Sequence, residues 1–112
     1  MDEKKRIQFR ERLHQEADTL RAAEAETSED RAPVELDQTS VGRLSRMDAL
    51  QQQAMAAAQS RRRSARLVSI NRALKRIDED EYGWCEECGD AIPEGRLDLD
   101  PTVARCVDCA GS

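Results

Sequence analysis

The sequence contains four cysteines, arranged as two C-x2-C pairs near its C-terminal end. Seventeen residues separate Cys85 and Cys88 from Cys106 and Cys109. A structural zinc ion takes four ligands at tetrahedral corners, and two such pairs supply four thiolates. The spacing lies within the usual range for zinc sites. We therefore predict that Cys85, Cys88, Cys106 and Cys109 bind one structural Zn2+ ion.

Other uses of four cysteines are less well supported. Disulfides need an oxidising compartment, whereas the charged start Met1-Asp2-Glu3-Lys4-Lys5 has no apolar run behind it and predicts no signal peptide. A cytoplasmic protein is the expectation. An iron–sulfur cluster uses the same four thiolates, and spacing does not distinguish it from zinc. Four protein ligands leave no open position for water or substrate, so we expect no enzyme activity at the metal.

Length and composition predict one small domain with a limited core. The chain has 112 residues, of which 38% are hydrophobic and only 3% aromatic. A chain this small and polar buries little apolar area, so its stability needs helix packing along one seam and a metal. No run approaches the roughly 18 apolar residues of a transmembrane helix, so no membrane association is expected.

The net charge of −5 hides blocks of opposite sign. Residues 81–112 hold eight acids and two bases, for −6, whereas residues 41–80 hold four acids and nine bases, for +5. The cysteine-bearing segment is therefore acidic, and a phosphate backbone would repel it. We expect no direct sequence-specific DNA binding.

Two long helices are predicted before the finger, over residues 2–27 and 41–79, with a connection at about 28–40. In the first helix, Ile7, Leu13 and Leu20 are the apolar points of a spacing of three and four residues. The second helix is too long to stand alone in water and needs a partner for its apolar stripe. The expected fold is therefore mostly α, a long antiparallel helical hairpin (coiled coil) followed by a small C-terminal zinc finger with four cysteine ligands.

The apolar pattern of the second helix predicts a stripe that changes phase along its length. The expected stripe has two parts: Val41, Leu44, Met47, Gln51, Ala54, Ala58, Arg61 and Ala65, then Leu67, Ile70, Leu74 and Ile77. Gly83 is the expected helix cap or hinge. The expected domains are a hairpin over residues 1–80 and a finger over 81–112. The expected apolar complement of the finger is Trp84, Ile92, Leu97, Leu99 and Val103.

The finger resembles the C4-type zinc finger of the DksA/TraR family. The family pattern has two Cys-x2-Cys pairs, an acid after the first cysteine, and Ile, Arg and Pro at fixed offsets between the pairs. The matching residues here are Cys85, Glu86, Cys88, Ile92, Arg96, Pro101, Cys106 and Cys109. The lead-in Asp80-Glu81-Tyr82-Gly83-Trp84 is also similar to the family's acidic and aromatic-glycine segment. The resemblance is specific over residues 70–110 and architectural over residues 1–69.

This resemblance implies a transcription regulator that is not an enzyme. Family members bind RNA polymerase, insert the hairpin into its secondary channel and bring acidic tip residues toward the active-site magnesium. They often act together with the alarmone ppGpp, which is therefore a further implied ligand. The second hypothesis is a small structural zinc protein that mediates another protein–protein contact through the hairpin.

The candidate partner-binding residues are acids near the tip and arginines of the second helix. The best-known family members carry Asp-x-x-Asp-x-Ala at the tip, and this chain has no such string. Asp37 and Asp48 are the candidate tip acids; the structural alternative is an N-cap for Asp37 and a solvated helix residue for Asp48. Arg62 and Arg66 share a helix face at a spacing of four, where they could meet an acidic polymerase surface or a phosphate-bearing effector. A solvated helix face is the alternative for both.

Overall fold

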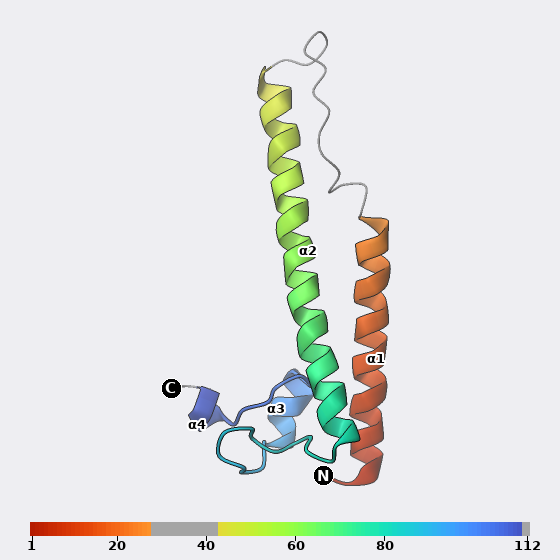
Figure 1. Ribbon diagram of the computed structural model, residues 1–112, viewed down its shortest axis with the longest axis vertical. Helices are drawn as coiled ribbons and strands as arrows, with labels where there is room; N and C mark the ends of the chain where they lie inside the picture. The colour runs from red at the N-terminus through yellow and green to blue at the C-terminus, as the bar shows by residue number, and fades with distance from the viewer. Residues whose placement is uncertain (28–42, 111–112) are drawn as a thin grey trace. The chain divides into compact units, whose positions relative to one another are not determined.

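The computed structural model describes residues 1–27 and 43–110, and four helices lie in these ranges (Figure 1). Two are long, α1 (Glu3–Glu26) and α2 (Arg43–Asp78), and two are short, α3 (Glu94–Leu99) and α4 (Val107–Ala110). The only pairing of extended backbone in the described part is an isolated bridge between Trp84 and Ala91. The predicted mostly α fold, a helical hairpin before a cysteine finger, is confirmed. The predicted connection at 28–40 lies outside the described residues.

The chain divides into two compact units. One contains Met1–Asp18 and Leu67–Ser112, so it joins the start of α1, the end of α2 and the whole finger. The other is the segment Thr19–Arg66, which holds the end of α1 and the first two thirds of α2. No described helix is long and apolar enough to cross a membrane.

The buried apolar residues of the described ranges all lie in the unit that contains the finger. Helices α1 and α2 run antiparallel there, and the finger supplies the rest of this core. Its buried apolar members are Phe9, Leu13, Ala17, Ile70, Ala73, Ile77, Tyr82, Cys85, Ile92 and Leu97, with Pro101 beside them. In the segment Thr19–Arg66, by contrast, every described side chain is at least partly exposed. Apolar burial therefore stabilises chiefly the unit that contains the finger.

The inward stripe of α2 keeps a single phase, contrary to the predicted phase shift. Residues that are buried or half-buried recur at alternating steps of three and four, as in a coiled-coil seam. The row with this spacing is Arg46, Ala49, Gln53, Ala56, Ser60, Arg63, Leu67, Ile70, Leu74 and Ile77, and the buried Ala73 lies beside it. Of the predicted first part, Met47, Gln51, Ala54, Arg61 and Ala65 are exposed, Ala58 is half-buried, and Val41 lies outside the described residues. The prediction was wrong because the first half of the seam is lined by polar and small side chains, which an apolar pattern cannot detect.

Helix α1 uses the predicted face at Leu13 and Leu20, but its buried stripe begins at Phe9 and not at Ile7. Phe9, Leu13 and Ala17 are buried and Leu20 is half-buried, again at a spacing of three and four. Ile7 is 49% exposed, so it is not part of this stripe. The prediction was wrong for Ile7 because this residue lies six positions before Leu13, about 120° away around the helix, whereas Phe9 lies only about 40° from Leu13.

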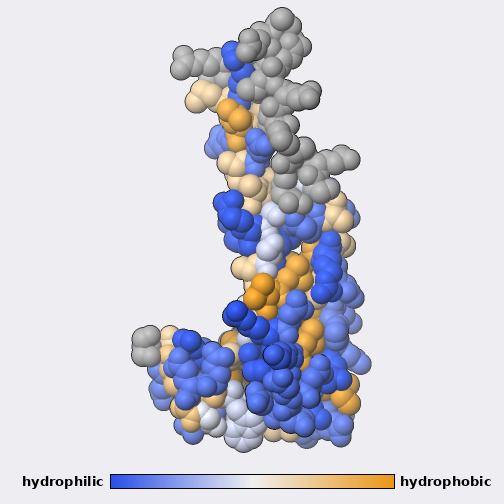
Figure 2. All heavy atoms as spheres, viewed as in Figure 1, coloured by the Kyte–Doolittle hydropathy of each residue, from blue (hydrophilic) through white to orange (hydrophobic). Residues whose placement is uncertain are grey.

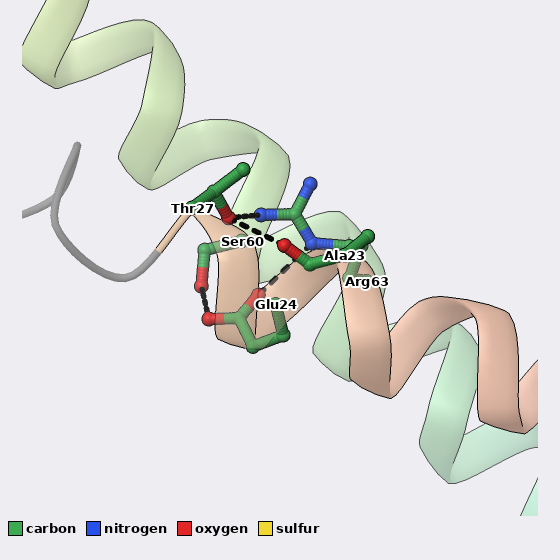
Figure 3. A network of polar contacts seen from close by, with 5 residues as sticks. All are labelled: Ala23, Glu24, Thr27, Ser60 and Arg63. Carbon is green, nitrogen blue, oxygen red and sulfur yellow. Dashed lines mark hydrogen bonds and ion pairs between the residues drawn. The ribbon is translucent and has the colours of Figure 1, made fainter.

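Polar side chains join α1 and α2 in the segment Thr19–Arg66 (Figure 3). Arg63 Nε donates to Glu24 Oε2 at 2.9 Å, and the Ser60 hydroxyl donates to Glu24 Oε1 at 2.7 Å. A second Arg63 nitrogen donates to the Thr27 hydroxyl at 2.7 Å, and Thr27 in turn donates to the carbonyl of Ala23 at 2.9 Å. The Arg63 side chain is only 16% exposed. Its charge is thus paired and hydrogen-bonded, as a half-buried charge requires.

Helix α2 ends at a left-handed residue that is not glycine. Asp80 has φ of 60°, its N–H donates to Ile77 O at 3.3 Å, and the N–H of Glu81 donates to Arg76 O at 2.8 Å. These two bonds form a Schellman cap with Asp80 at the position usually held by glycine. The predicted cap, Gly83, is instead part of the following turn. Asp78 and Asp80 oppose the helix dipole, but Arg10 and Arg6 of α1 form ion pairs with them.

The exterior is largely charged, as expected of a chain with 37% charged residues. Figure 2 shows a mostly hydrophilic visible face that is interrupted by scattered hydrophobic patches. Exposed large apolar residues in the segment Thr19–Arg66 are Met47, Leu50 and Met55.

The inward face of α1 predicts the effect of two matched truncations. Leu13→Ala removes a side chain that is fully buried, and it should lower the free energy of unfolding by about 2–5 kcal/mol. Ile7→Ala removes a half-exposed side chain of the same helix and should cost about 1 kcal/mol or less. Urea unfolding followed by circular dichroism measures both. Equal losses from the two variants would contradict the assigned face.

Candidate metal centre

The first cysteine pair lies in a tight turn between two short antiparallel segments. The N–H of Cys85 donates to Asp90 O at 2.8 Å, the N–H of Gly89 donates to Cys85 O at 3.0 Å, and the N–H of Ile92 donates to Gly83 O at 2.8 Å. Gly89 has φ of 79°, a conformation that side chains disfavour. The turn reverses the chain directly after Cys88 and holds both thiols of the pair on one side.

The second pair is positioned by the last helix and tied to the first. Cys106 precedes α4, and its carbonyl accepts the N–H of Ala110 at 2.9 Å, so Cys109 lies within one helical turn of Cys106. The N–H of Glu86 donates to Ala104 O at 2.8 Å. Arg105 forms ion pairs with Glu86 at 3.3 Å and with Glu87 at 3.2 Å. The two pairs are thereby brought together although seventeen residues separate them in sequence.

All four sulfur atoms lie within 4.8 Å of one another. The Cys88 and Cys106 sulfurs are 3.6 Å apart, which is much longer than a disulfide, and all four cysteines are free. A tetrahedral zinc ion with Zn–S bonds of about 2.3 Å separates its sulfurs by roughly 3.8 Å. The four thiols therefore fit one tetrahedral metal ion of this size, and they leave no ligand position open.

The pKa values of the thiols also favour a bound cation. Hydrogen bonds from the backbone N–H groups of Cys88 and Cys106 lower the pKa of the Cys85 thiol to about 6. Hydrogen bonds with the Cys106 and Cys85 sulfurs, together with burial, raise the pKa of Cys109 well above its usual range. One thiolate thus opposes the ionisation of another when no cation is present. A divalent ion removes this conflict because it binds the deprotonated form of every ligand.

The residues around and between the cysteine pairs attach the finger to the helices of the same unit. Tyr82 is buried, its hydroxyl donates to Pro101 O at 2.7 Å, and its ring packs against Phe9 of α1 with centroids 5.8 Å apart. Arg12 of α1 donates to Asp98 O at 2.7 Å, and Arg76 of α2 donates to Thr102 O at 3.3 Å. The finger therefore shares one core with the ends of both long helices.

The three non-cysteine positions between the pairs in the family pattern have structural roles here. Ile92 is 5% exposed and lies in the core. Arg96 Nε donates to Arg105 O at 3.1 Å, next to the second cysteine pair. Pro101 is fully buried and supplies the carbonyl that accepts the Tyr82 hydroxyl. The predicted apolar complement was wrong for Trp84 and Leu99, which are 51% and 87% exposed, because the finger is too small to cover every apolar side chain it carries.

The other predicted site residues lie away from the cysteines. Asp48 and Arg62 are exposed on α2, whereas Arg66 is half-buried and interacts within the chain. Asp37 lies outside the described residues. Arg63, the neighbour of Arg62, was not singled out by sequence reasoning, and its ion pair with Glu24 gives it a structural role. Arg63 lies four residues before Leu67, a predicted member of the inward stripe, and this spacing could have identified it as a seam residue.

Known proteins resemble both the finger and the fold. Residues 80–112 match the family model described as the prokaryotic dksA/traR C4-type zinc finger. The finger is a DksA/TraR-type C4 zinc finger. Its metal is therefore one structural zinc ion, as predicted, and the resemblance deduced from the sequence is confirmed for this segment.

Curated relatives match less than half of the chain. The RNA polymerase-binding transcription factor DksA of Escherichia coli (strain K12) is 37% identical over 51 residues, which are 45% of this chain and 34% of that protein. The factor of the same name from Haemophilus influenzae is 40% identical over 43 residues, or 38% and 30% of the two chains. The matched segments thus span about a third of the length of these relatives.

A solved structure extends the likeness to almost the whole chain. The transcription factor DksA2 from Pseudomonas aeruginosa superposes with a TM-score of 0.80 and 29% sequence identity. The superposition covers 99% of this chain and 84% of that one. The helical hairpin and the finger therefore occur in the same order and fold in both proteins.

Removal of the metal should unfold the finger. Structural zinc contributes on the order of 10 kcal/mol in small fingers, and four facing thiols do not replace that energy. After chelation, the amide resonances of residues 84–110 should collapse to random-coil positions in a 15N-correlation spectrum. Cys88→Ser should give the same spectrum without chelator. A near-native spectrum of this segment after verified loss of zinc would refute the prediction.

The buried Tyr82 hydroxyl predicts a loss of stability at high pH. Burial raises the pKa of Tyr82 to about 12, against the lowering effect of Arg76 and Arg12. Because the tyrosine of the unfolded chain ionises near pH 10, the buried neutral hydroxyl contributes its full stability below about pH 10. The free energy of unfolding should fall by on the order of 2 kcal/mol as the pH rises from about 10 to about 12. Tyr82→Phe should be less stable at about pH 8 by about 1–2 kcal/mol, since Pro101 O loses its donor.

Urea unfolding of the wild type and of Tyr82→Phe at about pH 8 and about pH 11 measures this effect. The variant is the matched control, because every other alkaline titration is common to the two proteins. The stability difference between them should shrink or change sign at the higher pH. A difference that stays constant between the two pH values would disprove the role of this hydroxyl.

Proposed function

We propose that this chain is a cytoplasmic transcription regulator that binds RNA polymerase, with Cys85, Cys88, Cys106 and Cys109 as the ligands of its zinc ion. The observation that carries the proposal is the likeness to transcription factor DksA2 over 99% of the chain. Curated relatives of part of the chain support it as well, because they are named RNA polymerase-binding transcription factors.

In this proposal the zinc has no catalytic role. Its four thiols close the coordination sphere, so the ion can neither activate water nor polarise a substrate. Zinc instead stabilises the finger, which in turn packs on Phe9 through Tyr82 and holds the ends of α1 and α2. We therefore assign the chain no enzymatic activity of its own and propose that it acts by altering the polymerase.

The regulatory end is proposed to be the hairpin tip, which inserts into the secondary channel of the polymerase. Asp48 is exposed near the start of α2, where a carboxylate could alter the field around a bound magnesium ion. Asp37 remains the other proposed tip acid. Because Asp-x-x-Asp-x-Ala is absent, the regulatory output of this tip is proposed to depend on a single acid or on these two acids together.

Arg62 and Arg66 are proposed to contact the polymerase or a phosphate-bearing effector such as ppGpp. Arg62 is exposed and lies one helical turn from Arg66 on α2. Residues 81–112 carry a net charge of −6, which disfavours contact with a phosphate backbone, so sequence-specific DNA binding is not part of the proposal.

Binding to core RNA polymerase tests this proposal. The zinc-loaded chain, labelled with a fluorophore at its N-terminus, should bind core polymerase with a dissociation constant in the micromolar range or tighter. Asp48→Asn and Asp37→Asn should weaken the effect on transcription in vitro while they change affinity by less than about twofold. Arg62→Ala should instead weaken binding about three- to tenfold through the lost charge.

Glu11→Gln is the matched control, since it removes one exposed acid from α1 far along the sequence from the tip residues. It should change neither binding nor transcription. Absence of binding at micromolar concentrations would leave the second hypothesis, a zinc protein with another protein partner. Loss of affinity in Asp48→Asn would make that residue a docking residue.

A further inference from the structure

The single tryptophan of the chain lies at the surface beside a pocket. Trp84 is 51% exposed, although it directly precedes the buried Cys85. The pocket has a volume of about 310 Å3 and is lined by Arg76, Asp80, Glu81, Trp84, Cys85 and Glu86. This volume is at the lower limit of ligand sites, so it suits one side chain of a partner better than a cofactor.

The side chains around this pocket are suited to a cation. Three of the six lining residues are acids, and an indole face attracts a cation placed over it. Arg76 is the only base in the lining, and it donates to the carbonyl of Thr102. The lining thus has an excess of two negative charges, which complements a guanidinium or ammonium group.

The carboxylates are not equally available. Asp80 is paired with Arg6, and Glu86 is paired with Arg105 at 3.3 Å. Glu81 is exposed, and its side chain forms no ion pair among the described residues. Glu81 is therefore the acid that can pair with an incoming cation without breaking an existing contact.

We propose that the pocket beside Trp84 binds an arginine side chain of a basic segment in a protein partner. The guanidinium stacks on the exposed indole of Trp84 and pairs with Glu81. Arginine is favoured over lysine because its planar group both stacks on an aromatic face and donates to a carboxylate in a fork geometry. Tryptophan is also a frequent anchor of protein interfaces. This site contains none of the proposed tip residues and does not depend on the polymerase being the partner.

The fluorescence of Trp84 reports on binding in the adjacent pocket, because Trp84 is the only tryptophan of the chain. The zinc-loaded full chain is titrated with an acetylated and amidated Arg-Gly-Arg-Gly-Arg peptide, which contains no aromatic residue. We expect a saturable change in tryptophan fluorescence with a dissociation constant on the order of 1 mM or below, and weaker binding as salt rises. The same peptide with citrulline in place of arginine keeps the shape without the charge and should not saturate.

Two variants with the same change of charge test the role of Glu81. Glu81→Gln should weaken binding of the arginine peptide about three- to tenfold. Glu94→Gln removes an exposed acid that does not line the pocket, and it should change affinity by less than about twofold. Equal losses in the two variants would overturn the proposal, since they would indicate nonspecific attraction to an acidic finger.

Trp84→Ala tests the aromatic contact with a readout that needs no tryptophan. Its backbone pairing with Ala91 does not involve the indole, so the finger should stay folded, which a 15N-correlation spectrum verifies. The arginine peptide should then shift the amides of residues 80–86 in the wild type and in Glu94→Gln, but not in Trp84→Ala. The proposal would also be overturned if the peptide changed no amide chemical shift in the wild type, or if it changed those of the wild type and of a folded Trp84→Ala equally.

Discussion

Four thiols within 4.8 Å of one another are the constraint on which the finger depends. The thiolates repel one another when ionised, and a divalent ion bound between them attracts all four and offsets this repulsion. The turn at Gly89 and the start of α4 hold the two pairs, and the bond from Glu86 N–H to Ala104 O joins them. Tyr82 and Pro101 then connect this centre to Phe9, so a metal site with little core of its own stabilises the ends of two long helices.

The two compact units are stabilised in different ways. The described part of the unit with the finger buries ten apolar residues, whereas that of Thr19–Arg66 depends on polar contacts such as Glu24 with Ser60 and Arg63. A paired, half-buried charge adds less stability than apolar burial, but a shift of one helix along the other would separate Arg63 from Glu24. The polar seam thus favours a defined register over tight packing, which suits a helix pair whose proposed function is to reach into a partner.

The proposed functional surfaces are separated along the chain. The tip acid Asp48 and the exposed Arg62 belong to α2, whereas the pocket of Trp84 and Glu81 belongs to the segment after it. The four thiols leave the zinc ion no open ligand position, and this agrees with the proposal that the chain acts through binding surfaces. In these proposals, the net charge of −6 on residues 81–112 favours basic protein surfaces over nucleic acid.

The amino-acid sequence was sufficient to predict the metal site, the helical class and the resemblance to the DksA/TraR finger. These depend on local features, such as ligand spacing, absence of breakers and residue identity at fixed offsets. The single phase of α2, the cap at Asp80 and the exposure of Trp84 became known only from the folded structure. Each of these depends on which groups meet or fail to meet across the fold. Arg63 can line the seam because Glu24 faces it, and Asp80 can end α2 because Arg6 neutralises it.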